Sequence, residues 1–134
     1  MKKFISGFVL CFMISAGALF AGEFLVVKSK IIAARDSAIA LIKNRDKRGA
    51  EQQKLVKDTA NEVSQALDKI KPSANKEAKY NELKSTWLAF KKLREEEIIP
   101  KVLAGKQDEA EKLANGVNKE RLTKMLELCD ELEK

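Results

Sequence analysis

Histidine is absent from all 134 residues of the chain. Because histidine is the usual general base and the commonest metal ligand, its absence removes most catalytic and metal-binding arrangements from consideration. Di-iron bundles need Glu-x-x-His pairs, and bundle-type haem proteins use an axial histidine or a Cys-x-x-Cys-His attachment, so these sites are excluded. The sequence also has no glycine-rich phosphate loop and no serine or threonine with a candidate base. We therefore predict that the protein is not an enzyme and holds no cofactor.

Cysteine is nearly as scarce, since the sequence has only Cys11 and Cys129. Cys11 falls in an apolar N-terminal run, so a processed chain keeps one thiol and forms no internal disulfide. Met125 precedes Cys129 by one helical turn, and two soft ligands at this spacing suit Cu(I). Met and Cys at helical spacing in an apolar stripe more commonly fill a core. We expect them to be core residues and predict no metal site.

The N-terminus combines the positively charged start Met1-Lys2-Lys3 with an apolar run from Phe4 to Ala21. This pattern is typical of a secretion signal peptide, which predicts a leader over residues 1–21 and a periplasmic domain over residues 22–134. The apolar run is about as long as the shortest membrane-spanning helices. An uncleaved N-terminal anchor is therefore the alternative.

Charge is plentiful but not concentrated, with 26 basic and 20 acidic residues and a net charge of +6. The two signs are interleaved, as on the solvated faces of amphipathic helices. A mildly basic exported protein rarely meets nucleic acid, so we exclude nucleic acid as a partner. The roughly 110 residues that follow the leader suffice for one domain with one hydrophobic core.

Apolar residues recur at steps of three and four in four segments, which is the pattern of amphipathic helices. The segments cover residues 23–45, 50–71, 75–103 and 108–133. Turn-forming residues separate them, namely Gly49, Pro72 and Gly105. No segment alternates with period two, so no sheet is predicted. Because short turns make sequential helices antiparallel, we predict an all-α fold: an antiparallel up-down-up-down four-helix bundle after an N-terminal signal peptide.

The predicted apolar stripes imply that particular residues are buried. Leu25 and Ile39 widen the apolar stripe of the first helix, and Val117 continues the stripe of the fourth. Gly116 weakens the fourth helix by about 1 kcal/mol relative to alanine and predicts a local bend. Pro100 lies inside the third segment, where it removes one backbone hydrogen bond and predicts a kink.

Residues 80–132 resemble the second half of the four-helix-bundle sensor module of methyl-accepting chemotaxis receptors. The residues that carry this likeness are Trp87-x-x-Phe90, Ile98-Ile99-Pro100, Ala104-Gly105 and Glu109-Ala110. Their order matches an aromatic third helix, a short turn with glycine and an acidic start to the fourth helix. An apolar N-terminal segment followed by four helices also matches the first membrane helix and sensor module of such a receptor.

In a complete receptor the fourth helix continues into a second membrane span and a cytoplasmic signalling domain, whereas this sequence ends at Lys134. The resemblance therefore implies a stand-alone, periplasmic sensor-like module without its own signalling domain. Its expected partners are a small organic acid or amino acid, a membrane receptor, or a second copy in a homodimer. A structural or protein-interaction bundle and an envelope-stress chaperone are the alternative functions.

Two arginines form the candidate ligand site. Arg35 and Arg121 come at similar heights when counted from the first and third turns, which share one end of an antiparallel bundle. Arg121 stands between Val117 and Met125, where a purely structural helix carries an apolar residue. Arginine binds carboxylates through two parallel hydrogen bonds, and receptors of the resembled family hold acids with arginines between helices. We hypothesise that Arg35 and Arg121 bind a small carboxylate.

Arg94 and Trp87 are further candidates for ligand binding. Arg94 continues the series of Trp87 and Phe90 and could equally pair with Glu97 or Glu95. Trp87 offers a ring for ligand stacking, with a role as a core anchor as the alternative. For the arginines the alternative is that their stems cover the core while their charged heads stay in water.

We predict that the native protein begins near Gly22 and is located in the periplasm of a double-membraned cell, because Lys2 and Lys3 precede an apolar run. Intact-mass measurement of the protein purified from its natural host identifies its first residue. Retention of Met1 together with a membrane-bound fraction would instead support the anchored form.

Overall fold

The computed structural model describes residues 22–134, which are helical apart from short turns and contain no strand. The all-α prediction is confirmed, whereas the predicted signal peptide lies outside the described residues. Within residues 22–134 no helix combines the length and the apolar character needed to cross a membrane. The elements are α2 (Glu23–Lys43), α3 (Ala50–Lys69), α4 (Glu77–Leu93), α5 (Ile99–Leu103), α6 (Gln107–Asn115), α7 (Val117–Glu133), the 3-10 turns η1 (Arg45–Lys47) and η2 (Ala74–Lys76), and the π-helical segment η3 (Arg94–Ile98).

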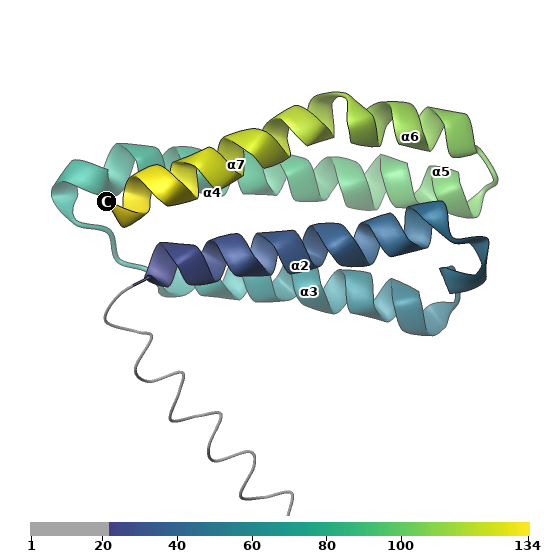
Figure 1. Ribbon diagram of the computed structural model, residues 1–134, viewed down its shortest axis with the longest axis horizontal. Helices are drawn as coiled ribbons and strands as arrows, with labels where there is room; N and C mark the ends of the chain where they lie inside the picture. Colours follow the sequence, from purple (N-terminus) through teal and green to yellow (C-terminus); the bar gives the residue numbers. More distant parts are fainter. Residues whose placement is uncertain (1–21) are drawn as a thin grey trace, which may run out of the picture.

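These elements make four helical arms, formed by α2, by α3, by α4 with η3 and α5, and by α6 with α7. Figure 1 shows the arms lying lengthwise beside one another. α2 packs against α3 and α7, and α4 packs against α7. Trp87 in α4 also reaches α3, where its Nε1 donates a hydrogen bond of 3.0 Å to Oγ of Ser64. The arm boundaries differ from the predicted segments by no more than two residues.

The interior contains two groups of buried apolar residues. The larger group includes the aromatic residues of α4 together with Met125 and Cys129, both 0 % exposed, so their predicted core role is confirmed. The smaller group lies nearer the first and third turns and consists of Ala38, Leu41, Ile42, Val56, Ile98, Val102 and Ala110. α2 contributes to both groups, with Ala34 in the larger and Ala38 in the smaller. The boundary between the two groups therefore falls between Ala34 and Ala38, which are one helical turn apart in α2.

The apolar stripes differ from the predicted ones at three positions. Leu25 and Ile39, predicted to widen the first stripe, are 48 % and 39 % exposed, because the inner face of α2 is already filled by its other apolar residues. Val117, predicted to be in the fourth stripe, is 41 % exposed, while Asn118 beside it is buried.

Gly116 explains the shift in the fourth arm. Its backbone leaves the helical conformation (φ −96°, ψ −110°), and the arm divides there into α6 and α7, which confirms a local break at this residue. A Cβ atom at Gly116 would lie 2.9 Å from the carbonyl oxygen of Lys112, closer than side chains normally approach. Continuing the 3.6-residue period across this break placed Val117 in the buried stripe, and that assignment is wrong.

The π-helical segment follows from the spacing of buried residues in the third arm. Phe90, Arg94, Ile98 and Val102 are all buried and recur in steps of four. In an α-helix each step of four rotates the buried face by roughly 40°, so three such steps would turn Val102 away from the core. A π turn holds more residues than an α turn and cancels this rotation. Pro100, which lacks a backbone N–H, follows at the first turn of α5, where the missing donor is tolerated.

The first and third turns are fastened to each other. Arg48 donates hydrogen bonds to the carbonyl oxygens of Leu41 (3.0 Å) and Ile42 (2.6 Å), which lie at the unpaired C-terminal end of α2. Its Nη2 also donates to Oε1 of Gln107 (2.7 Å), whose own amide donates to Ile42 (2.9 Å). Gly105, with φ +83°, closes the third turn as predicted.

The beginning and the end of the described chain also meet. Oε1 of Glu133 accepts hydrogen bonds from the backbone N–H groups of Phe24 (3.0 Å) and Leu25 (3.2 Å). These two donors belong to the first turn of α2, where no partner exists within the helix itself. The last turn of α7 therefore caps the first turn of α2.

We predict that the Cys129 thiol is unreactive in the native protein. Burial raises its pKa to about 12, and Asp130 acts in the same direction, so the reactive thiolate is scarce. In a Cys11→Ser chain, where Cys129 is the only thiol, disulfide-reagent labelling at mildly alkaline pH should accelerate by about a hundredfold or more on adding denaturant. Equally fast labelling in native buffer would contradict this burial.

Candidate functional site

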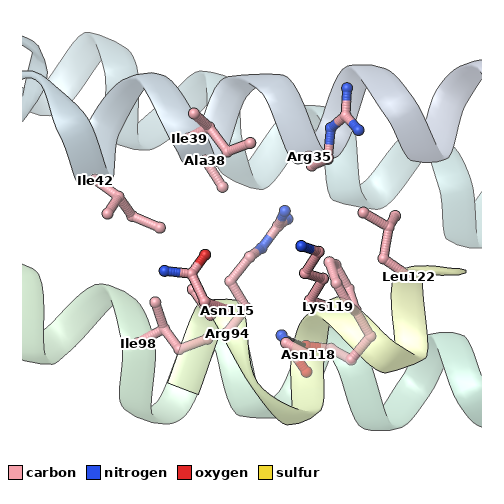
Figure 2. Close-up of a pocket in the computed structure, with 12 residues that line it drawn as sticks. Arg35, Ala38, Ile39, Ile42, Arg94, Ile98, Asn115, Asn118, Lys119 and Leu122 are labelled. Atoms are coloured by element: carbon pink, nitrogen blue, oxygen red, sulfur yellow. Dashed lines mark hydrogen bonds between the residues drawn. The ribbon is translucent and has the colours of Figure 1, made fainter. Parts of the chain in front are cut away.

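A cavity of about 230 Å³ lies between α2 and the region where the third and fourth arms meet (Figure 2). Seven apolar residues form most of its wall: Ala38, Ile39, Ile42, Phe90, Ile98, Ala114 and Leu122. Five polar or charged residues complete it: Arg35, Arg94, Asn115, Asn118 and Lys119. Residues from both hydrophobic groups contribute, so the cavity occupies the division of the interior.

Two irregular stretches of backbone bring these residues together. η3 supplies Arg94 and Ile98 from its π-helical turn, and the break at Gly116 lies between Asn115 and Asn118. A regular α-helix places residues one position apart about 100° around its axis. At the wide turn of η3 and at the break at Gly116 the side chains depart from this regular angular spacing. These two departures lie on two sides of the cavity.

Arg94 is the central polar residue of the site. Its side chain is only 2 % exposed and extends from η3 toward α2 (Figure 2). Nη1 donates a 2.9 Å hydrogen bond to the carbonyl oxygen of Ala34 in α2. The guanidinium carbon lies 5.6 Å from the ring centre of Phe90, a cation–π contact. The guanidinium is therefore held in place on one edge and over one ring.

The other edge of the Arg94 guanidinium is unpaired. Nε and Nη2 are buried and have no hydrogen-bond partner among residues 22–134. In a guanidinium, the Nε–H bond and one Nη2–H bond point in parallel, and this pair can donate two hydrogen bonds to a single carboxylate. Buried donors without partners are costly and rare in native proteins. An edge of this geometry can bind an anion, and because both atoms are closed to water in the unliganded protein, neighbouring side chains must move to let the anion reach it.

The charges around the cavity are of one sign. Burial lowers the pKa of Arg94 to about 10, while Glu95 opposes that change, so the guanidinium stays charged at neutral pH. Lys119 and Arg35 add two further positive groups, and no Asp or Glu is among the lining residues from the described part of the chain. A buried positive charge without an acidic partner favours an anion as the missing partner.

Asn118 connects the cavity to the interface of α4 and α7. Its amide nitrogen donates to the carbonyl oxygen of Phe90 (3.1 Å), and its amide oxygen accepts from Nη1 of Arg121 (3.2 Å). Nη1 of Arg121 also donates to the carbonyl oxygen of Ala89 (3.3 Å). Both polar atoms of the Asn118 amide are thus engaged within the protein, which leaves Arg94 with the free buried donors.

The four candidate residues from the sequence occupy different places. Arg94 and Arg35 line the cavity, and Arg35 also forms an ion pair with Asp36 (2.9 Å). Arg121 is not among the lining residues and is directed to the carbonyl oxygen of Ala89 in α4. Trp87 is 1 % exposed and stacks on Phe90, and it does not line the cavity. Whether any of the four contacts a ligand remains a prediction.

Sequence reasoning missed Asn118 and Lys119. Both follow Gly116, and the helical break there rotates α7 relative to the period of α6. The dipeptide Asn115-Gly116 was the available signal, because Gly ends regular helix more readily than other residues apart from Pro. Reading a new helix from Val117 would have placed Asn118 with the buried residues Met125, Cys129 and Leu132.

Comparison with known proteins leaves the site to be interpreted from its own geometry. No protein-family model, no curated protein and no solved structure matches the chain. Among residues 22–134 no group of three His, Cys, Asp or Glu side chains is arranged to hold a metal ion.

We predict that Arg94→Met stabilises the unliganded protein. The substitution removes a buried charge that lacks an acidic partner, and methionine keeps an unbranched apolar stem over Phe90. Chemical denaturation should show the free energy of unfolding rising by about 1–3 kcal/mol. Arg35→Met, at a half-exposed residue of the same cavity, should change it by about 0.5 kcal/mol or less. Destabilisation by Arg94→Met would show that the Ala34 hydrogen bond serves the fold.

Proposed function

We propose that the protein is a periplasmic, sensor-like helical module that binds a small organic anion in the cavity beside Arg94. One observation carries this proposal: Arg94 is almost fully buried in the cavity wall, with Nε and Nη2 unpaired. Natural proteins keep such costly groups mainly at functional sites, where ligand binding offsets the cost. The excess of positive charge around the cavity supports an anion as the ligand.

The proposal includes an antiparallel up-down-up-down arrangement of the four arms. The hydrogen bond between Arg48 and Gln107 supports it, because it joins the first and third turns at one end. The hydrogen bonds from Phe24 and Leu25 to Glu133 support it at the other end. The reversals of the ribbon visible in Figure 1 agree with both. In this arrangement a ligand between α2 and α7 lies between the first and fourth arms, the pair expected from the sequence.

Ligand binding in this cavity can change how the arms pack against one another. An anion on the free edge of Arg94 would contact residues of the third arm, and its remaining atoms would lie against Ile39 of α2 and Leu122 of α7. One ligand thus bridges three arms and favours the arrangement in which they are close together. A module of this kind transmits ligand occupancy to a membrane receptor or to a second copy through its changed surface.

The resemblance to chemotaxis-receptor sensor modules is consistent with this proposal. Those modules are helical, lie outside the inner membrane and bind small solutes between helices. The apolar segment before residue 22 supports an exported location. Arg94 takes the central role that the sequence hypothesis gave to Arg35 and Arg121, because its guanidinium is the buried one with a free edge.

We predict that small organic acids stabilise the wild-type protein and not Arg94→Met. A thermal-shift screen of monocarboxylates, dicarboxylates and amino acids tests this. A ligand that binds only the folded state adds about 2.7 kcal/mol at a hundredfold excess over its dissociation constant, which raises the midpoint by several degrees. Arg45→Met is the matched control, since Arg45 is exposed in η1 and, among the described residues, neither lines the cavity nor forms a hydrogen bond with a residue that does, and it should keep the response. If no acid shifts wild type, the module is better interpreted as a protein-interaction bundle.

A further inference from the structure

The charge, polarity and size of the cavity beside Arg94 restrict the class of ligand that it can bind. Resting on the proposed function, we infer that its ligand is a small apolar monocarboxylate without an amino group. The carboxylate binds the Nε and Nη2 edge of Arg94, and the hydrocarbon part lies against Ile39, Ile42, Ile98 and Leu122. This assigns a ligand class that is narrower than organic anions in general.

The charge of the lining residues excludes α-amino acids. An amino acid carries an ammonium group next to its carboxylate, and this group needs an acceptor or an acidic partner when it leaves water. No Asp or Glu is among the lining residues in the described part of the chain, and Asp36, the neighbour of Arg35 in sequence, is already paired with Arg35. Arg94, Arg35 and Lys119 would instead repel the ammonium group. Amino acids therefore bind much more weakly than the matching simple acids.

The distribution of polarity favours a single carboxylate. Arg94 is the buried positive group, whereas Lys119 is exposed and Arg35 is half-exposed. Apart from Asn118, the remaining buried wall near Arg94 consists of apolar side chains, including Ala38, Ile42 and Ile98. The Asn118 amide is already hydrogen-bonded to Phe90 and Arg121. A second carboxylate on the ligand would find only the solvent-screened charges of Lys119 and Arg35, which contribute little, and it would lose water against the buried wall.

The size of the cavity limits the hydrocarbon part. An apolar cavity of about 150 Å³ holds benzene, so a cavity of about 230 Å³ accommodates a ligand of about nine non-hydrogen atoms. Branched aliphatic acids such as 4-methylpentanoate fall within this limit and place methyl groups against the isoleucine side chains. Each buried CH₂ contributes about 0.8 kcal/mol of transfer free energy, so affinity should increase with chain length up to this size.

Matched ligands of one carbon skeleton test the inference by titration calorimetry of the processed protein. 4-Methylpentanoate should bind, and leucine, which is its α-amino derivative, should bind about a hundredfold more weakly or worse. The neutral 4-methylpentanamide should bind about tenfold more weakly than 4-methylpentanoate, because it cannot form charge-assisted hydrogen bonds with Arg94. Pentanedioate, which stays within about nine non-hydrogen atoms, should bind more weakly than pentanoate, since its second carboxylate faces the apolar wall.

Two variants test whether Arg94 binds the carboxylate of the ligand and whether Ile39 contacts its hydrocarbon part. Arg94→Met should abolish binding of 4-methylpentanoate and of acetate alike. Ile39→Ser, at an exposed residue whose replacement leaves the core intact, should reduce the affinity advantage of 4-methylpentanoate over acetate by about threefold or more. Circular dichroism and the unfolding midpoint confirm that each variant is folded.

The outcomes separate this inference from the proposed function. If leucine or pentanedioate binds more tightly than its simple counterpart, and does so through Arg94, the inference is overturned while anion binding in the cavity stands. If no carboxylate binds to the folded wild-type protein, both fail. An unchanged preference for 4-methylpentanoate in Ile39→Ser would show that the hydrocarbon part does not lie against this wall.

Discussion

A positive charge taken out of water must find compensating interactions, and in this protein one guanidinium faces that requirement in the middle of the helical interior. Arg94 obtains a carbonyl oxygen of α2 on one edge and the ring of Phe90 on one face, but nothing within the described chain on its second edge. The apolar interior consequently forms two groups, with the cavity where they would otherwise join. The division of the core and the cavity have one physical origin.

The backbone around Arg94 is irregular for reasons that can be traced to spacing. Three successive steps of four residues, from Phe90 to Val102, keep a common buried face only if the helix widens, and η3 provides the wider turn. On the opposite side Gly116 ends α6 and allows Asn118 to turn inward. Both irregularities carry polar side chains to the interior, where regular amphipathic helices would have placed apolar ones.

Periodicity alone located the four arms, since a stripe of apolar residues persists over several turns and tolerates small errors at each end. The direction of Arg121 was harder to predict than its height: Lys119 and Leu122 line the cavity together with Arg35, but Arg121 donates to Ala89 of α4 instead. The break at Gly116 changes the rotation of the fourth arm, which counting residues along one continuous helix does not include. Arg94 was visible as a charged member of the Trp87 and Phe90 series, but not its unpaired edge. That feature depends on the distance between α2 and η3, which no local pattern contains.

Glu133 has a consequence for the topology of the molecule. By accepting hydrogen bonds from Phe24 and Leu25, it joins the two ends of the described chain over a sequence separation of 109 and 108 residues. The polypeptide from residue 22 to residue 134 is therefore nearly a closed ring, in which the position of the termini is incidental to the packing. Chains whose ends are neighbours tolerate circular permutation. A permuted chain opened between α3 and η2 would retain both the Arg94 cavity and the contacts that surround it.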